Sequence, residues 1–278
     1  MKKLKLGLIG VGIENSRSPA LHKQIGQLCG LDVTYNLINL ESSAKESFNQ
    51  ALSECKIQGY HGVNITHPFK ENAAKVVTIT SNLVKNLAAV NIVKFNLDFE
   101  DKGYNSDYTG FKRAFRLRFP GQKPRKVALI GAGGIGRAIA FGLADLRAEE
   151  IRVYDQDYLR SQSLVKALNF QDQSRVFLCN SLEDAIKNVN GLVNATPVGM
   201  HNHLGTPIPK NYLGSQSWVF DAVYTPIKTT FLLDASEAGL EILSGFELFF
   251  YQGIEAFEIF SGVSLDESQL RKELFQNI

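Results

Sequence analysis

Residues Lys126–Ile130 (KVALI) lead into the run Gly131-Ala132-Gly133-Gly134-Ile135-Gly136, which is followed by Arg137-Ala138-Ile139-Ala140. The apolar stretch predicts a buried strand, and the residues after the glycines predict a helix. The spacing G-x-G-x-x-G permits a tight turn and brings a pyrophosphate close to a helix N-terminus. The six residues of this glycine loop (131–136) are therefore predicted to bind a dinucleotide.

An acidic residue follows the next predicted strand, Ile151–Tyr154. Asp155 stands about 20 residues after the last glycine, where a carboxylate accepts hydrogen bonds from the ribose hydroxyls of NAD and repels a 2′-phosphate. Asp157 is a competing candidate for this role, and Arg160 would favour NADP if it reached a 2′-phosphate. The pattern favours NAD and leaves NADP open.

Short strands alternate with helices along the rest of the chain, which predicts βαβ units and a mostly parallel sheet. A break with two prolines and a glycine (residues 119–124) separates an N-terminal α/β region from the region with the glycine loop. The sequence thus predicts an α/β protein with two parts. Before the break we expect strands at Leu4–Ile9, Val33–Ile38 and Gly62–Ile65, and a helix at Pro19–Leu28 with Ser18 as its N-cap.

Composition excludes several classes of protein. The 278 residues are 44% hydrophobic and 21% charged, which is typical of a globular chain of one or two domains. Thirty Lys+Arg against 28 Asp+Glu leave a net charge of +2, so neither a nucleic acid nor an anionic membrane is expected as a partner. No apolar run approaches the ~18 residues of a membrane helix. Three scattered cysteines indicate a reducing, cytoplasmic setting.

The N-terminal part carries a second candidate for chemistry, Gly62-Val63-Asn64-Ile65-Thr66-His67-Pro68-Phe69-Lys70. It is a strand followed by a polar turn and a lysine, at the strand end where ligands of α/β proteins gather. An oxidoreductase that transfers a hydride also needs a proton donor near the substrate oxygen. Taken alone, however, Lys70 is most simply a surface lysine.

Motifs along nearly the whole chain resemble those of the shikimate/quinate dehydrogenase family. Besides the glycine loop and the segment just quoted, they are Ser16-Arg17-Ser18-Pro19-Ala20-Leu21-His22, Ala89-Val90-Asn91, Gly103-Tyr104-Asn105-Ser106-Asp107, Asn194-Ala195-Thr196-Pro197-Val198-Gly199-Met200, Asp221-Ala222-Val223-Tyr224-Thr225-Pro226 and Tyr251-Gln252-Gly253. Asp155-Gln156-Asp157 stands where NADP-using members have Asn-Arg-Thr, so the chain is most similar to the NAD-using quinate/shikimate branch.

The resemblance implies a substrate-binding domain at residues 1–103, completed by C-terminal helices at 240–278, and a Rossmann NAD(P)-binding domain at 104–239. It implies reversible hydride transfer between the nicotinamide and C3 of shikimate, with 3-dehydroshikimate as the oxidised partner and quinate as an open further substrate. Such an enzyme serves the shikimate pathway toward chorismate and aromatic amino acids; the direction in this chain, biosynthetic or catabolic, is left open.

The same resemblance assigns roles to individual residues. Lys70 and Asp107 correspond to the catalytic pair of the family. Residues that match substrate ligands are Ser16, Ser18 and Tyr224 for the carboxylate, and Thr66, Asn91 and Gln252 for the hydroxyls. Thr196 and Pro197 join the glycine loop and Asp155 as expected cofactor contacts. Neutral hydroxyl and amide side chains suit a small ring that carries several hydroxyl groups, because each can donate or accept.

The sequence leaves two alternatives to an NAD-linked dehydrogenase of shikimate. An NADP-linked biosynthetic shikimate dehydrogenase is the second candidate, and a sensor that binds quinate or shikimate without turnover is the third. The sensor would be expected to lack the pair Lys70 and Asp107, and both are present. His201 and His203 have no carboxylate or third ligand near them in sequence, so no metal site is expected. We expect a monomer or a homodimer in the cytoplasm.

Overall fold

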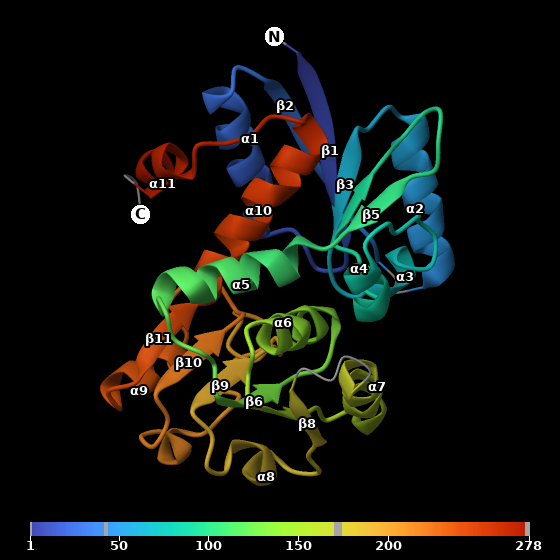
Figure 1. Ribbon diagram of the computed structural model, residues 1–278. Coiled ribbons are helices and arrows are strands. Elements are labelled where there is room, and N and C mark those ends of the chain that lie inside the picture. Colours follow the sequence, from blue (N-terminus) through green and yellow to red (C-terminus); the bar gives the residue numbers. More distant parts are fainter. Residues whose placement is uncertain (1, 42–43, 170–173, 276–278) are drawn as a thin grey trace. The chain divides into compact units, whose positions relative to one another are not determined.

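The computed structural model describes residues 2–41, 44–169 and 174–275, which form two compact units. Unit 1 comprises Met1–Ser106 and Gln252–Ile278, and unit 2 comprises Asp107–Tyr251. The chain passes from one unit to the other inside two helices, α5 (Ser106–Arg118) and α10 (Gly245–Ser261). Each unit has its own sheet, as predicted for an α/β chain (Figure 1).

The sheet of unit 1 has the strand order β2-β1-β3-β4-β5. Its strands are β1 (Lys3–Gly10), β2 (Asp32–Asn39), β3 (Gly62–Ile65), β4 (Ile92–Lys94) and β5 (Lys102–Tyr104). The first three pair in parallel, as expected, whereas β4 and β5 are antiparallel additions. The sheet is thus mixed, because the short loop between β4 and β5 allows a hairpin and needs no crossover helix.

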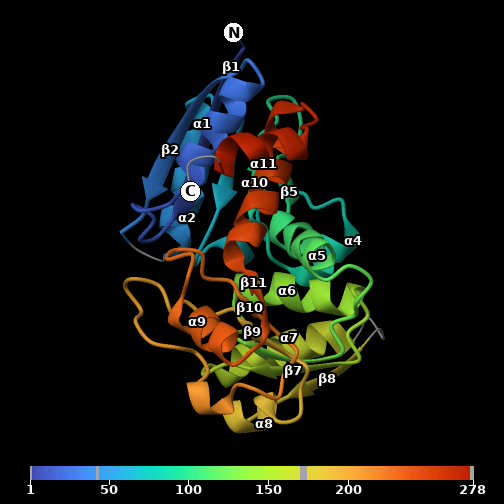
Figure 2. The ribbon, with the colours of Figure 1, turned by 90° about the vertical axis from the view of Figure 1, so that its left-hand side faces the viewer.

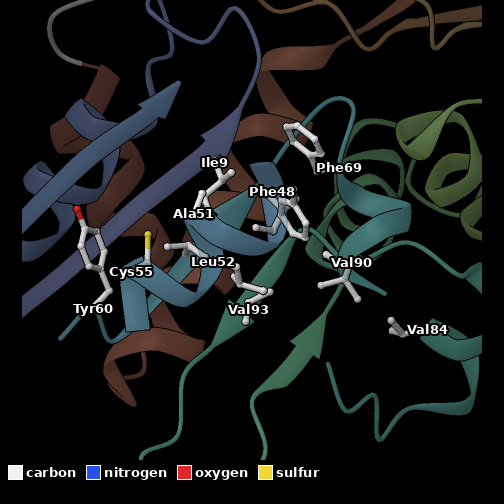
Figure 3. Close-up of a cluster of buried hydrophobic side chains, with 13 residues drawn as sticks. Ile9, Phe48, Ala51, Leu52, Cys55, Tyr60, Phe69, Val84, Val90 and Val93 are labelled. Atoms are coloured by element: carbon white, nitrogen blue, oxygen red, sulfur yellow. The ribbon is translucent and has the colours of Figure 1, made fainter. Parts of the chain in front are cut away.

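Helices cover both faces of this sheet (Figures 1 and 2). They are α1 (Ser18–Leu28), α2 (Lys45–Ile57), α3 (Lys70–Ala73), α4 (Asn82–Leu87), α11 (Glu267–Phe275) and the C-terminal part of α10. On one face, α2 packs Phe48 and Leu52 into a buried cluster with Val63 and Val93 of the strands (Figure 3). On the other face, Phe260 of α10 lies against Gly62, where a Cβ atom would be 2.5 Å from its ring. Burial on both faces explains why the second part of β1 (residues 6–10) carries no polar side chain, whereas the edge strand β2 is less buried and carries several.

Unit 2 contains a six-stranded sheet with the order β11-β10-β9-β6-β7-β8, in which every pair is parallel. The strands are β6 (Lys126–Ile130), β7 (Glu150–Tyr154), β8 (Arg175–Leu178), β9 (Gly191–Asn194), β10 (Trp218–Asp221) and β11 (Glu241–Ser244). The helices are α6 (Gly134–Asp145), α7 (Tyr158–Asn169), α8 (Leu182–Ile186) and α9 (Thr230–Glu237), with the 3₁₀ turn Lys210–Tyr212. The strand order reverses its direction between β6 and β9 at the centre of the sheet. In such sheets, ligands bind at the carboxyl ends of the strands on either side of this reversal.

Both faces of the second sheet are also covered. One face packs Leu192 and Val219 against Phe231 of α9 and Ile186 of α8. On the other face, α5 supplies an aromatic ridge, in which Phe111 contacts Phe220 and Phe115 contacts Trp218 edge-on. Among the described residues, no helix is long and apolar enough to cross a membrane.

Candidate active site

The loops that follow β1 and β3 of unit 1 are tied together at the carboxyl end of the sheet. The Thr66 amide donates to the Ile9 carbonyl (3.0 Å), and the Val11 amide donates to the His67 carbonyl (3.1 Å). Gly10 allows this approach, because a Cβ at this position would lie 2.4 Å from Cγ2 of Thr66. The segments that carry the predicted substrate ligands Ser16 and Thr66 are therefore neighbours.

The loop with the two serines is held by a side chain of β2. Oδ1 of Asn39 accepts a hydrogen bond from the Gly12 amide (2.9 Å), and its Nδ2 donates to Glu14. Oγ of Ser16 accepts from the Ser18 amide at 3.3 Å. A hydroxyl that accepts in this way still has its own hydrogen to donate, which suits an anionic ligand. Sequence reasoning gave no role to Asn39, since its partners lie 27 and 25 residues away.

The prediction that Ser18 caps the first helix is wrong. Helix α1 begins at Ser18 itself, and Arg17 occupies the N-cap position without a side-chain cap hydrogen bond. The Ser18 amide is instead satisfied by the hydroxyl of Ser16, which acts in place of a cap. Both serine side chains thus lie at the N-terminal end of α1, where the helix dipole favours negative charge.

Lys70 lies at the start of α3, directly after the turn at Thr66. The Phe69 amide donates to the Thr66 carbonyl (2.9 Å), and the Lys70 carbonyl accepts from the Val90 amide (2.9 Å). The His67–Pro68 peptide bond in this turn is cis. Backbone hydrogen bonds on both sides fix the position of the Lys70 backbone relative to the sheet, and the residue is half-buried.

Asn91 is buried and holds the start of α5. Its Oδ1 accepts from the Ser106 amide (2.8 Å), and its Nδ2 donates to the Ser106 hydroxyl (3.1 Å). One Nδ2 hydrogen remains for another acceptor, so a role toward substrate is compatible with this contact. Asp107 comes next, in the first turn of α5. A carboxylate there is stabilised by the free amides of the helix start.

Two further predicted substrate ligands are on or near α10. Gln252 lies in α10 within unit 1, next to Gly253, whose missing side chain admits Leu21 of α1. Tyr224 belongs to unit 2, and its ring stacks on Phe249 with the centroids 4.5 Å apart. The structure thus places six predicted residues in unit 1 (Ser16, Ser18, Thr66, Lys70, Asn91 and Gln252) and two in unit 2 (Asp107 and Tyr224).

The glycine loop connects β6 to α6 as predicted. Gly131 has φ +101°, a conformation that favours glycine, and a Cβ on Gly136 would lie 2.1 Å from the Gly131 carbonyl oxygen. Beside Gly133 the space is open, because a Cβ there would have no atom within 4 Å. The tight turn and the open space at the start of α6 (Gly134–Asp145) are what a bound pyrophosphate requires.

Asp155 follows β7 and is bonded to this loop. Its Oδ2 accepts from the Ala132 amide (2.6 Å), and its Oδ1 accepts from the Asp157 amide (2.8 Å). The carboxylate is therefore held at the edge of the predicted cofactor site. Arg160, the residue that would favour NADP, forms an ion pair with Asp157 at 3.2 Å.

The loop after β9 carries the predicted cofactor contacts Thr196 and Pro197. Thr196 donates from both its amide (3.0 Å) and its hydroxyl (2.7 Å) to Oδ1 of Asn194. The loop lies against the glycine loop, since a Cβ on Gly131 would be 3.0 Å from Cγ2 of Thr196. Pro197 is exposed beside it. Among the described residues, no group of His, Cys, Asp and Glu has the arrangement of a metal site.

Together, these features define a class of protein. A parallel sheet with a glycine loop after β6 and a carboxylate after β7, joined to a unit that presents hydroxyls and a lysine at its strand ends, is the structure of an NAD(P)-dependent oxidoreductase.

Comparisons with known proteins specify the family. Residues 8–93 match the model of the shikimate dehydrogenase substrate binding domain. A quinate/shikimate dehydrogenase (NAD(+)) of Corynebacterium efficiens is 35% identical over 96% of this chain and 95% of its own length. The chain belongs to the shikimate/quinate dehydrogenase family.

Solved structures agree with this assignment. The quinate dehydrogenase of Corynebacterium glutamicum in complex with NAD is 33% identical and superposes with a TM-score of 0.87, covering 99% of this chain and 100% of that one. The shikimate 5-dehydrogenase of Thermus thermophilus in complex with NADP(H) and shikimate is 29% identical, with a TM-score of 0.83 over 99% of this chain and 100% of that one. The family inferred from the sequence motifs, the fold class and the enzyme class are therefore confirmed.

Proposed function

We propose that the protein transfers a hydride reversibly between NAD and C3 of shikimate, with 3-dehydroshikimate as the oxidised partner. The observation that carries the cofactor choice is the carboxylate of Asp155, bonded to the Ala132 amide beside the glycine loop. A carboxylate at this point favours ribose hydroxyls over a 2′-phosphate. The ion pair of Arg160 with Asp157 adds support, because it occupies the cation that a 2′-phosphate would need.

The bound cofactor would be held by residues 131–136, Asp155, Thr196 and Pro197, and its nicotinamide would supply the hydride acceptor or donor. In our proposal, Lys70 gives a proton to the substrate oxygen or takes it away, depending on direction. Asp107 orients the ammonium group of Lys70. An ammonium beside the reacting oxygen also stabilises negative charge as it develops there.

Substrate recognition in this proposal uses neutral side chains. Ser16, Ser18 and Tyr224 hold the carboxylate, aided by the N-terminal end of α1, and the ring hydroxyls bond to Thr66, Asn91 and Gln252. A site built to bond hydroxyls rejects an analogue that lacks them, because its own polar groups would be left unpaired. The expected substrate domain (residues 1–103 with 240–278) corresponds to unit 1 and the expected cofactor domain (104–239) to unit 2, except that β11 (Glu241–Ser244) pairs with β10 and belongs to the cofactor domain. We expect the enzyme to be a cytoplasmic monomer or homodimer.

Quinate is a second candidate substrate. It is favoured by the similarity to relatives named quinate/shikimate dehydrogenase (NAD(+)), which include those of Corynebacterium efficiens and Corynebacterium glutamicum. Quinate and shikimate share the carboxylate and several hydroxyls, so all the side chains named above would serve both.

Initial-rate kinetics with shikimate and with quinate, each against NAD and NADP, test the proposal. We expect the highest kcat/KM with shikimate and NAD, and measurable turnover of quinate with NAD. A higher kcat/KM with NADP would overturn the cofactor assignment. An absence of turnover with all four pairs, in protein that binds NADH, would favour a sensor.

A further inference from the structure

Asp221 is a buried acidic residue that the proposed mechanism does not use. It ends β10, has no exposed surface, and accepts hydrogen bonds from three different segments of unit 2. The donors are Nδ2 of Asn194 at the end of β9 (2.8 Å), the amide of Val223 (3.0 Å) and the hydroxyl of Thr229 (2.6 Å). These strands and helices can be followed in Figure 2.

The first of these contacts extends into the loop after β9. Nδ2 of Asn194 also donates to the Val198 carbonyl (3.0 Å), and its Oδ1 accepts both hydrogen bonds from Thr196. The Thr196 hydroxyl in turn accepts from the Val198 amide at 3.2 Å. The polar groups of this loop are thus organised around Asn194, and Asn194 is oriented by Asp221.

The other two contacts hold the segment after β10. The Val223 amide that donates to Asp221 belongs to the residue next to Tyr224. Thr229 caps α9, because its hydroxyl accepts from the Leu232 amide (3.2 Å) while it donates to Asp221. Asp221 therefore fixes both ends of the segment from Val223 to Thr229, which includes Tyr224.

From this arrangement we propose that Asp221 is a positioning residue that sets, at once, the cofactor contacts of Thr196 and Pro197 and the substrate contact of Tyr224. The inference rests on the proposed function for the roles of those three residues. One buried carboxylate would thus align both the loop after β9, which is expected to contact the cofactor, and the segment after β10, which is expected to contact the substrate.

The chemistry of the site explains why the residue is an aspartate. All three neighbours donate, and an ionised carboxylate accepts only. Burial raises the pKa of Asp221 to about 6, because a buried carboxylate loses the hydration that stabilises its charge. The three hydrogen bonds act in the opposite direction and stabilise the ionised carboxylate. An asparagine has the same shape but would turn an N–H group toward a donor. The variant D221N therefore disturbs the alignment without leaving a cavity.

The test compares D221N with the wild type in the full-length enzyme. We expect the KM for NAD and the KM for shikimate each to rise about tenfold and kcat to fall about tenfold, as loss of a charge-assisted hydrogen bond gives roughly that factor. A role limited to folding would lower the amount of active enzyme and leave both KM values unchanged. Unchanged KM values would thus overturn the proposal.

Two variants of Thr229 serve as matched controls if D221N folds poorly. T229S keeps the hydroxyl that donates to Asp221 and should behave like the wild type. T229V removes that donor but keeps the carboxylate, and should raise both KM values about threefold. KM values equal to those of T229S would overturn the proposal.

Binding of NADH, followed by fluorescence, tests the positioning role of Asp221 separately from the proposed function. If the wild type turns over none of the four substrate and cofactor pairs, the proposed function fails, while a weaker NADH affinity in D221N still supports the role of Asp221.

Discussion

The candidate functional groups of unit 1 differ in kind from those of unit 2. In unit 1 the candidate ligands are side chains on loops, such as Ser16, Thr66 and Lys70, and the backbone serves to fix those loops. In unit 2 the glycine loop offers backbone amides and open space beside Gly133, and a Cβ added to Gly136 would lie only 2.1 Å from the Gly131 carbonyl oxygen. The difference teaches where change is tolerated. Unit 1 should be sensitive to the loss of a side chain, and unit 2 to the addition of one.

The largest expected effect is that of K70A in unit 1. Turnover should fall about 10³-fold, within the range for loss of a general acid or base, because in our proposal the Lys70 ammonium exchanges a proton with the substrate oxygen. The KM for NAD should change less than twofold. Initial rates at saturating NAD measure both.

K75A is the matched control, since Lys75 is an exposed lysine five residues further along the same segment. It should retain the activity of the wild type. If K70A kept turnover within tenfold of K75A, Lys70 would have no catalytic role, and unit 1 would not depend on its side chains in the way we describe.

The second prediction tests whether unit 2 is sensitive to an added side chain. It uses two single glycine-to-alanine variants of the glycine loop, G136A and G133A. G136A places a Cβ 2.1 Å from the Gly131 carbonyl oxygen, so it should lower the free energy of unfolding by about 1–3 kcal/mol. G133A meets no atom within 4 Å and should leave the fold as stable as the wild type. Its methyl group, however, enters the space where we expect the pyrophosphate.

Thermal unfolding and NADH titration separate these two variants. G133A should unfold at the wild-type temperature and bind NADH at least about tenfold more weakly, a loss of about 1.4 kcal/mol. If G133A bound NADH normally, the pyrophosphate would lie elsewhere. Equal stability of G136A and the wild type would show that the loop relaxes easily, which contradicts close packing as the basis of this unit.

The third effect concerns Asp155. This residue differs from the glycine loop of unit 2, because it is expected to bind the cofactor through its side chain. D155A should weaken NAD about tenfold or more, as expected for lost hydrogen bonds to a charged group, and should weaken NADP less. The ratio of kcat/KM with NAD to that with NADP measures the shift. D157A, two residues further on, is the control; if it changed the ratio as much as D155A, the ribose ligand would be Asp157.

The sequence predicted the local features of both units well. The alternation of strands and helices, the glycine loop and the carboxylate after β7 all follow from residues close together in the chain, where spacing determines geometry. The contacts of Asn39 with Gly12 and of Asp221 with Thr229 and Asn194 could not be derived in this way. They depend on which strands are neighbours, and Asn194 and Asp221 pair across β9 and β10 although 27 residues separate them.

One local expectation also failed for a physical reason. Ser18 before Pro19 has the sequence of a helix cap, yet Ser16 takes part in satisfying the first amide and the helix starts one residue earlier. Ser16 two positions further back accepts from the Ser18 amide, and the Leu21 amide, which a Ser18 cap could have bound, donates to the Arg17 carbonyl (3.1 Å). Propensity alone does not contain that information.

The smallest expected effect is the pH dependence of stability, which differs between the two units because each contains a different buried titratable group. His22 of unit 1 is buried with its Nδ1 unpartnered, and burial lowers its pKa from 6.5 to about 3. The folded state thus keeps His22 neutral while the unfolded chain takes up a proton, so unit 1 loses stability as the pH falls below 6.5. The loss is at most about 1.4 kcal/mol per pH unit. Asp221 of unit 2 has the opposite sign, because its raised pKa costs stability as the pH rises from 3.8 to about 6.

Hydrogen exchange, corrected for the intrinsic rates, distinguishes the units at pH 6.5 and pH 5. We expect α1 and β2 to lose protection at pH 5, since His22 lies in α1 and stacks on Tyr35 of β2 at 4.7 Å. Unfolding of unit 2, reported by Trp218, should be shifted the other way. H22F keeps an aromatic ring beside Phe257 and Phe260 but cannot take up a proton. It should therefore abolish the loss of protection in unit 1 and leave unit 2 unchanged. A similar loss in H22F would place the acid sensitivity in another group.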